Sequence, residues 1–192
     1  SPAQVITARQ GLGYTRRALN LQKLAQAIDG ELPRHPADLI KLPGIGPGTA
    51  GSIAAFAYDM PVVFIETNIR RVFIHHFFED QEGIDDKQLL PLVEGALDRE
   101  HPREWYYALM DYGSYLAKTV PNPNRRSKHH VVQSKFEGSD RQIRGAVLRA
   151  LIKKSLTKKQ LIEQTRCSEK ILLQLANEGM IQLHNNKYRL PR

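Results

Sequence analysis

The chain has 192 residues, 41% of them hydrophobic, and its 28 Lys and Arg against 20 Asp and Glu give a formal net charge of +8. Its apolar runs fall well short of the ~20 residues that cross a bilayer, which excludes a membrane-spanning role. The single cysteine excludes disulfides within the chain and a multi-cysteine metal cluster. Together with an N-terminus that lacks a signal-peptide pattern, it indicates a reducing compartment, the cytoplasm or nucleoid.

The positive charge is concentrated toward one end of the chain. Residues 1–120 hold 12 Lys and Arg against 15 Asp and Glu, a net charge of −3, whereas residues 121–192 hold 16 against 5, a net charge of +11. Nucleic acid is the commonest polyanion in a cell, so the basic end predicts a nucleic-acid partner, with plain solubility as the alternative.

Helical periodicity dominates residues 1–120. In residues 15–29, apolar side chains recur on one helix face, namely Ala18, Leu19, Leu21, Leu24, Ala25 and Ile28, and Gly30 ends the helix. Residues 61–65 (PVVFI) form a short extended apolar stretch. Further helices are expected at residues 36–41, 49–58, 66–78, 86–99 and 102–117. We therefore predict an all-α domain over residues 1–120.

The remainder of the chain has a different pattern. Residues 121–139 are basic and aperiodic, which indicates a linker or strap. Helices are expected at residues 140–153, 158–164 and 169–178, the last two with Thr157 and Ser168 as N-caps. A β-hairpin is expected about Asn185-Asn186. Three helices and a hairpin predict a small winged-helix-like DNA-binding domain at residues 140–192, with DNA contacted by its third helix or by the wing.

The most informative motif is LPGIGPGTA at residues 42–50, where a Gly/Pro turn leads into an apolar helix. Gly44 and Gly46 permit backbone conformations that side chains forbid, so that successive N–H groups can point outward at the start of the helix. Such a helix start binds phosphate without reading sequence. The alternative is an ordinary helix-turn-helix connection with a glycine cap.

With this motif, the chain resembles the helix-hairpin-helix DNA glycosylase superfamily, most closely the MutY-type adenine glycosylases and more distantly endonuclease III. The resemblance covers about residues 1–120. Besides the hairpin, it rests on GLGY at residues 11–14 with Arg17 following, on VFIETNIRRV at residues 63–72, and on ALMDYG at residues 108–113.

The resemblance implies the chemistry of base excision. Glu66 stands where the family has its catalytic carboxylate, which stabilises the cationic sugar or activates water as the base leaves. Asn68 matches the asparagine of the same loop and is expected either to orient the carboxylate or to hold the DNA backbone. Tyr14 matches the tyrosine that wedges into the base stack. For Glu66 the alternative is a helix cap or dipole partner. DNA contacts are expected at Tyr14, Arg17, Gly44, Ile45, Gly46, Gly48, Thr49, Arg70, Arg125, Arg126, Lys128, Lys187 and Arg189.

The chain departs from the family at several places. Glu66 replaces the usual Asp, and Gly48 replaces the lysine that endonuclease III-type lyases use, so a monofunctional hydrolysis is expected. The segment directly after Gly113, residues 114–130, contains no cysteine, so no iron–sulfur cluster and no other cofactor is expected. Adjacent histidines at 75–76 and 129–130 point to different helix faces, and no metal site is expected. The family's upstream helices, which supply a general-acid glutamate, have no counterpart in these residues. We therefore expect an N-terminally incomplete domain, whose upstream segment is cut away, lies on another chain or was lost, with self-association as another way to cover its helices.

The leading interpretation is a monofunctional DNA glycosylase acting on duplex DNA that contains a damaged or mismatched base, with adenine opposite oxidised guanine as the substrate that the resemblance implies. The first alternative is a catalytically silent module that binds lesions or bent DNA. The second is a winged-helix transcription regulator, which the hairpin and the Glu66 loop disfavour.

Overall fold

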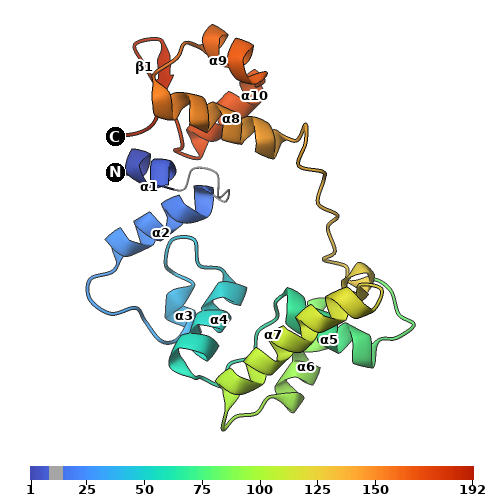
Figure 1. Ribbon diagram of the computed structural model, residues 1–192. Coiled ribbons are helices and arrows are strands. Elements are labelled where there is room, and N and C mark those ends of the chain that lie inside the picture. The colour runs from blue at the N-terminus through green and yellow to red at the C-terminus, as the bar shows by residue number, and fades with distance from the viewer. Residues whose placement is uncertain (9–14) are drawn as a thin grey trace. The chain divides into compact units, whose positions relative to one another are not determined.

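The computed structural model describes residues 1–8 and 15–192 (Figure 1). The predicted wedge residue Tyr14 lies outside the described residues. The elements, in chain order, are the helices α1 (Pro2–Ala8), α2 (Thr15–Ala27), α3 (Pro36–Leu39), α4 (Pro47–Tyr58), α5 (Thr67–Phe77), α6 (Asp86–Ala96) and α7 (Pro102–Thr119), the 3-10 helix η1 (Pro123–Arg126), the helices α8 (Asp140–Lys153), α9 (Lys158–Thr165) and α10 (Glu169–Asn177), and the strands β1 (Gln182–His184) and β2 (Lys187–Arg189).

The expected all-α class with a winged-helix-like C-terminal part is confirmed, and most helix boundaries agree to within two residues. Helix α4 begins at Pro47, two residues earlier than predicted, because proline at the first helical position is pre-set for the helix. Helix α6 ends at Ala96, three residues early, where Asp98 accepts the backbone N–H groups of Glu100 and His101 and holds a turn. In the described residues no helix is both long and apolar enough to cross a membrane.

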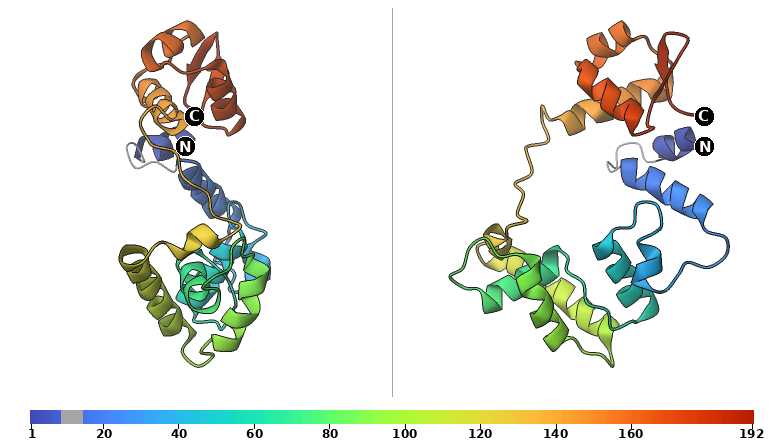
Figure 2. Two further views of the ribbon diagram at one scale, coloured as in Figure 1. Left: turned by 90° about the vertical axis from the view of Figure 1, so that its right-hand side faces the viewer. Right: turned by 180° about the vertical axis from the view of Figure 1, so that it is seen from behind.

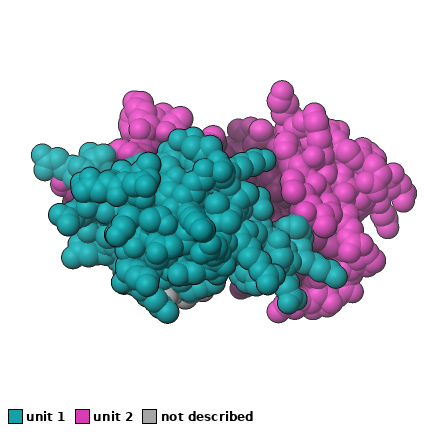
Figure 3. All heavy atoms as spheres, turned by 90° about the horizontal axis from the view of Figure 1, so that it is seen from above, with its two compact units in different colours: residues 1–29, 133–192 teal, residues 30–132 magenta. Residues whose placement is uncertain are grey.

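The chain forms two compact units, coloured separately in Figure 3: unit 1 comprises Ser1–Asp29 and Gln133–Arg192, and unit 2 comprises Gly30–Val132. This corrects the predicted domains at residues 1–120, 121–139 and 140–192. Helices α1 and α2 belong with the C-terminal helices, because Ile6 and Leu19 are buried in the same core as Val147 and Leu151. The backbone N–H of Ala3 also donates to the carbonyl of Pro191 at 3.0 Å.

Unit 1 has the winged-helix arrangement of α8, α9 and α10 followed by a hairpin, best seen in Figure 2. Asn185 and Asn186 both take the left-handed conformation, with φ of 47° and 58°, as the two-residue turn between β1 and β2 requires. A third chain segment joins this sheet through an antiparallel bridge between Leu156 and Tyr188. Thr157 caps α9 and Ser168 caps α10, as predicted.

The apolar face predicted for α2 is only partly buried. Leu19 is 5% exposed, whereas Leu21 is 64% exposed. The spacing of apolar residues therefore predicts the helix correctly but does not predict which of its side chains are buried.

Unit 2 is built around α5 and α7, with α4, α6 and η1 packed about them. The core centres on aromatic residues, and Tyr106 is fully buried, with its hydroxyl donating to the carbonyl of Val62 at 2.7 Å. Burial raises the pKa of Tyr106 to about 12, so its hydroxyl stays protonated and keeps this hydrogen bond. This bond anchors the extended stretch that leads to Glu66.

The beginning of the predicted linker is part of unit 2. Ser127 pairs with Ile84 in a parallel bridge, and the Asn124 side chain donates to the Thr67 carbonyl at 2.9 Å. Arg126 donates to the carbonyls of Phe78, Glu79 and Ile74 and so caps the end of α5. A segment without periodicity can still be fixed by such specific hydrogen bonds, which sequence patterns do not reveal.

Helices α5 and α7 approach each other so closely that only glycine fits at position 113. A Cβ atom there would lie 2.6 Å from Cβ, 2.7 Å from O and 2.8 Å from Cα of Asn68. Two of these atoms are backbone, so the helices themselves would have to separate.

We expect Gly113→Ala to lower the free energy of unfolding by about 1–3 kcal/mol, the usual cost of overpacking. The matched control is Gly95→Ala on α6, where an added Cβ meets nothing within 4 Å. This control should gain about 0.5–1 kcal/mol from the higher helix propensity of alanine. Urea unfolding of both variants measures the difference, and equal stabilities would contradict the close crossing.

Candidate nucleic-acid interface and active site

The start of α4 presents backbone donors that the protein does not use. Gly44 has φ of 77°, and Gly46 is the N-cap with φ of −96° and ψ of 174° and no side-chain cap. Pro47 has no N–H, and within the described part of the chain the amides of Gly48 and Thr49 donate to no carbonyl or side chain. Two unused donors at the positive end of a 12-residue helix form a site suited to an anion.

Ile45 has a different role from the one predicted. Its side chain is only 8% exposed and its amide donates to the carbonyl of Leu42 at 3.2 Å. It therefore fixes the turn from inside and offers neither side chain nor N–H to DNA, which corrects its assignment as a DNA contact.

The hairpin and the predicted catalytic loop lie next to each other. A Cβ atom at Gly48 would lie 3.6 Å from the carbonyl oxygen of Ile65, the residue before Glu66. Behind this contact, Gly51 packs so tightly on Phe64 that a Cβ there would lie 2.4 Å from the Phe64 Cβ. Two segments that are separate in the sequence are thus brought together, and the Gly48 position has ordinary van der Waals room.

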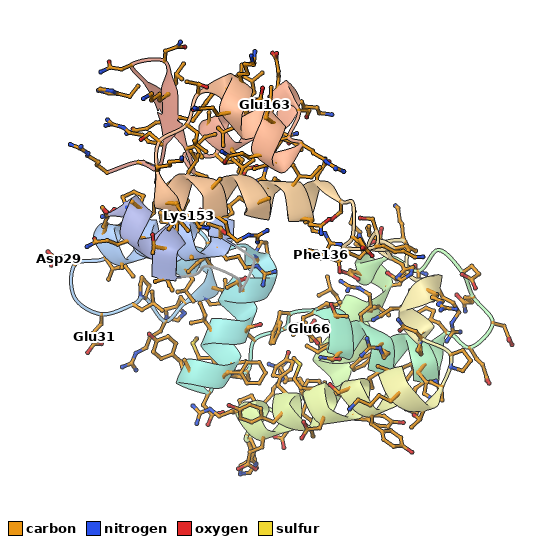
Figure 4. The ribbon with its side chains drawn as sticks, turned by 45° about the horizontal axis from the view of Figure 1, so that its top comes forward. Asp29, Glu31, Glu66, Phe136, Lys153 and Glu163 are labelled. Atoms are coloured by element: carbon orange, nitrogen blue, oxygen red, sulfur yellow. The ribbon has the colours of Figure 1, made fainter. Side chains whose placement is uncertain are left out.

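Glu66 is the N-cap of α5 (Figure 4). Its Oε1 accepts the backbone N–H of Asn68 and that of Ile69, the latter at 2.9 Å. Among the described residues no hydrogen bond reaches the second oxygen, Oε2. The side chain is partly exposed. The cap thus uses one carboxylate oxygen and fixes the group, while the other oxygen stays available.

The Asn68 side chain does not touch the Glu66 carboxylate. Its Oδ1 accepts Arg71 Nη1 at 2.6 Å, and its Nδ2 lies 3.7 Å from the sulfur of Met110. Only the backbone N–H of Asn68 serves Glu66. The predicted orienting role of the amide is therefore corrected to a backbone role, with the side chain turned toward α7.

Arg70, predicted to contact DNA, is engaged elsewhere. Its Nε and Nη2 donate to the two carboxylate oxygens of Asp86 at 2.7 Å each, a bidentate ion pair. The hydrogen bond to Asp86 raises the pKa of Arg70, with a smaller contribution from Glu66. We therefore no longer assign Arg70 to phosphate; it links α5 to α6 and places a positive charge near Glu66.

The predicted DNA contacts in the basic segment, residues 121–139, differ in whether their side chains are free to bind DNA. Arg125 is exposed, whereas Arg126 is used to cap α5, which corrects its assignment to DNA. Lys128 has a 66% exposed side chain that lies 3.3 Å from Asp85. An ion pair this exposed is weak, so Lys128 can exchange Asp85 for another anion.

The remaining predicted DNA contacts are in unit 1. Arg17 and Lys187 are exposed, on α2 and β2 respectively. Arg189 stands opposite Gln182 in the hairpin, and with the Gln182 amide oxygen turned toward it, Arg189 Nε donates at 2.9 Å. Arg189 is thereby partly committed to its neighbouring strand.

The network around Arg71, which is only 8% exposed, was not predicted from the sequence. Its Nη1 donates to Asn68 Oδ1 and to the Gly113 carbonyl, both at 2.6 Å, and its Nε to Asn122 Oδ1 at 3.2 Å. Arg71 thus ties the start of α5 to α7 and to the segment before η1. An arginine beside Arg70 looks like a surface residue, and only its place next to the buried Ile69 and Val72 hints otherwise.

The iron–sulfur cluster of the resembling family does not fit this chain. Such a cluster needs four cysteine thiolates, and the chain has one cysteine, Cys167, buried in the core of unit 1. Within residues 1–8 and 15–192, no group of three or more His, Cys, Asp or Glu side chains is arranged to hold a metal ion.

Comparison with known proteins agrees with this geometry. A helix-hairpin-helix motif model matches residues 27–56, which include α3 and most of α4. An adenine DNA glycosylase of Mycolicibacterium smegmatis is 31% identical over 171 residues, covering 78% of this chain and 58% of that protein. Endonuclease III of Bacillus subtilis is 32% identical over 145 residues, covering 71% and 63%.

An adenine DNA glycosylase of Buchnera aphidicola is 32% identical over 126 residues, which is 62% of this chain and 36% of that protein. The chain thus spans between 36% and 63% of the length of these relatives. Among solved structures, a non-covalent endonuclease III–DNA complex has a similar fold, with a TM-score of 0.50 and 23% identity over 63% of this chain and 59% of that chain. The hairpin, the fold and the relatives agree, and the chain belongs to the helix-hairpin-helix DNA glycosylase superfamily.

Proposed function

We propose that this chain carries out base excision in DNA repair at the nucleoid, as a monofunctional DNA glycosylase that hydrolyses the N-glycosidic bond of a damaged or mismatched base. Adenine opposite oxidised guanine is the proposed substrate, because adenine DNA glycosylases are among its relatives. The observation that carries the proposal is the Glu66 carboxylate, fixed by its cap and with one oxygen uncommitted, beside the unused amides of the hairpin.

The hairpin would hold a backbone phosphate near the scissile bond. The amides of Gly48 and Thr49 donate to the anion through main-chain atoms, so the grip is the same for every sequence. An enzyme that searches DNA for rare lesions needs this property. A base extruded from the duplex can then reach the loop that carries Glu66.

Glu66 would act on the sugar as the base departs. Loss of the base builds positive charge on the sugar ring, and the free carboxylate oxygen can stabilise that charge or take a proton from the attacking water. Gly48 offers no amine for a Schiff base, so hydrolysis is the remaining route. The leaving base also needs a proton, a role that the resemblance assigns to a glutamate on an upstream helix.

The second candidate is a catalytically silent module that binds lesions or bent DNA. It is favoured by one observation, that the Glu66 carboxylate already has a structural role as the cap of α5. The two candidates share the hairpin and differ only in whether Glu66 does chemistry, so substitutions at Glu66 separate them.

Gly46→Ala tests the hairpin without disturbing the fold. The Gly46 backbone angles suit any residue, and an added Cβ meets nothing within 4 Å, so the variant adds a methyl group in open space at the N-cap, directly before the helix start that carries the unused amides. We expect duplex affinity to fall about 10-fold, the loss of roughly one hydrogen bond to a charged group. Fluorescence anisotropy with duplex DNA measures it.

The matched control for the hairpin is Gly95→Ala, which also adds a methyl group in open space but on α6. It should bind DNA as the unmodified chain does. Equal affinities for the two variants would show that the start of α4 does not contact the phosphates.

Glu66→Gln should abolish base excision and leave DNA binding unchanged or slightly tighter. The amide keeps an oxygen for the Asn68 and Ile69 amides, so the helix cap survives while the charge that stabilises the cationic sugar is lost. A loss of about 10²–10³ in rate is expected. The assay is single-turnover release of adenine opposite oxidised guanine, using this chain and a version with the upstream segment restored.

Glu66→Ala separates the two roles of this residue. It removes charge and cap together, and should lower the free energy of unfolding by about 0.5–2 kcal/mol, whereas Glu66→Gln should not. Excision by the restored Glu66→Gln protein at the unmodified rate would reduce Glu66 to a helix cap. Absence of excision by both unmodified proteins would favour the silent module.

A further inference from the structure

Unit 1 contains a groove that the proposed active site does not use. It is an open cavity of about 630 Å³ between the start of α9 and the tip of the β-hairpin formed by β1 and β2. The residues that line it come from α9 and its N-cap and from the turn between the strands: Thr157, Lys158, Lys159, Ile162, Glu163 and Asn186. Lys187, the next residue of the hairpin, is exposed.

The distribution of charge around the winged-helix arrangement is unusual. In helix-turn-helix proteins the second helix of the motif, here α10, enters the major groove and reads bases. Residues 169–178, which contain α10, hold one lysine against two glutamates. Leu173 on this helix is 62% exposed. Helix α10, which is the helix expected to enter the major groove of DNA, is therefore not attractive to DNA.

The cations lie instead on α9 and on the β-hairpin. Residues 158–166 hold Lys158, Lys159 and Arg166 against Glu163, and the hairpin strands hold Lys187 and Arg189 with no acidic residue. This charge complements a polyanion, and Lys158 and Lys159 line the groove itself.

Two of the cations that line the groove or adjoin its lining residues are available to a ligand. Lys158 is paired with Glu169, and Arg189 has Gln182 opposite it. Lys159 and Lys187 are exposed, and within the described residues neither has a carboxylate within 4.0 Å. Glu163 lies one turn further along α9 (Figure 4), so a phosphate is favoured at the beginning of the helix and disfavoured beyond it. The capping box of Thr157 and Gln160 occupies the helix end, so the side chains supply the attraction.

We propose that this groove binds the sugar–phosphate backbone of DNA. The winged-helix-like part of unit 1 is then a sequence-independent anchor, which holds DNA by α9 and the β-hairpin of β1 and β2 and not by α10. The occupant follows from the proposed function, whose substrate is DNA. Phosphate contacts of this kind position a protein on DNA and carry no sequence information.

The chain offers a matched pair of lysines for the test. Lys159 is the second residue of α9 and Lys170 the second residue of α10, and both are exposed. In the full chain, Lys159→Gln should weaken binding to an undamaged duplex about 3- to 5-fold at low salt and reduce the slope of log affinity against log salt by about 0.9. Lys170→Gln should change neither quantity. Two duplexes of equal length and unrelated sequence should give the same result.

Each other outcome overturns the inference. A loss from Lys170→Gln alone, or equal losses from both variants, would place DNA on α10. No loss from either would mean that this part of unit 1 does not hold DNA, and dependence of the Lys159 effect on sequence would mean base reading. Thermal unfolding followed by circular dichroism confirms that both variants remain folded.

The experiments distinguish a failure of the DNA anchor in unit 1 from a failure of the proposed base excision. Binding to an undamaged duplex does not require base release, so an absence of excision in the Glu66 experiment leaves the Lys159 result intact. Excision without a Lys159 effect would overturn the anchor alone.

Discussion

The close crossing of α5 and α7 is the contact on which the candidate site depends. Gly113 allows the backbone of α7 to meet Asn68 in the first turn of α5, and Arg71 bonds to both residues from inside the crossing. The first turn of α5 is also the turn whose amides bind Glu66. A displacement of α7 would therefore move the two donors that fix the carboxylate, although α7 does not itself touch Glu66.

The cap and the proposed chemistry of Glu66 are compatible because a carboxylate has two oxygens. Oε1 binds two backbone donors at the positive end of α5, which restricts the side chain to one position. A group that stabilises developing charge must be in place before the reaction, since reorganisation during the reaction would cost free energy. The longer side chain of Glu relative to Asp need not loosen the site, because the cap removes the freedom that the extra methylene adds.

Local features of the fold could be predicted from the sequence, because they depend on local chemistry. Thr157 and Ser168 as caps and Asn185-Asn186 as a turn each act within a few residues. The partners of long side chains could not be predicted. Arg70 meets Asp86 and Arg126 meets the end of α5 only after folding, so both were assigned to DNA on their charge alone. The grouping of α1 and α2 with the C-terminal helices likewise depends on contacts between distant segments.

The two units differ sharply in charge, and this bears on how a shared DNA ligand would be held. Unit 1 holds 17 Lys and Arg against 6 Asp and Glu, whereas unit 2 holds 11 against 14. Unit 2 has a net negative charge and repels a polyanion at long range. Its helix-hairpin-helix turn at residues 42–50 must therefore bind phosphate through short-range main-chain donors. Those donors are few and fixed in direction, which suits them to positioning one phosphate near Glu66. Under the proposed function, the long-range attraction and the salt dependence that comes with it must then arise mainly in unit 1, where cations outnumber acids almost three to one.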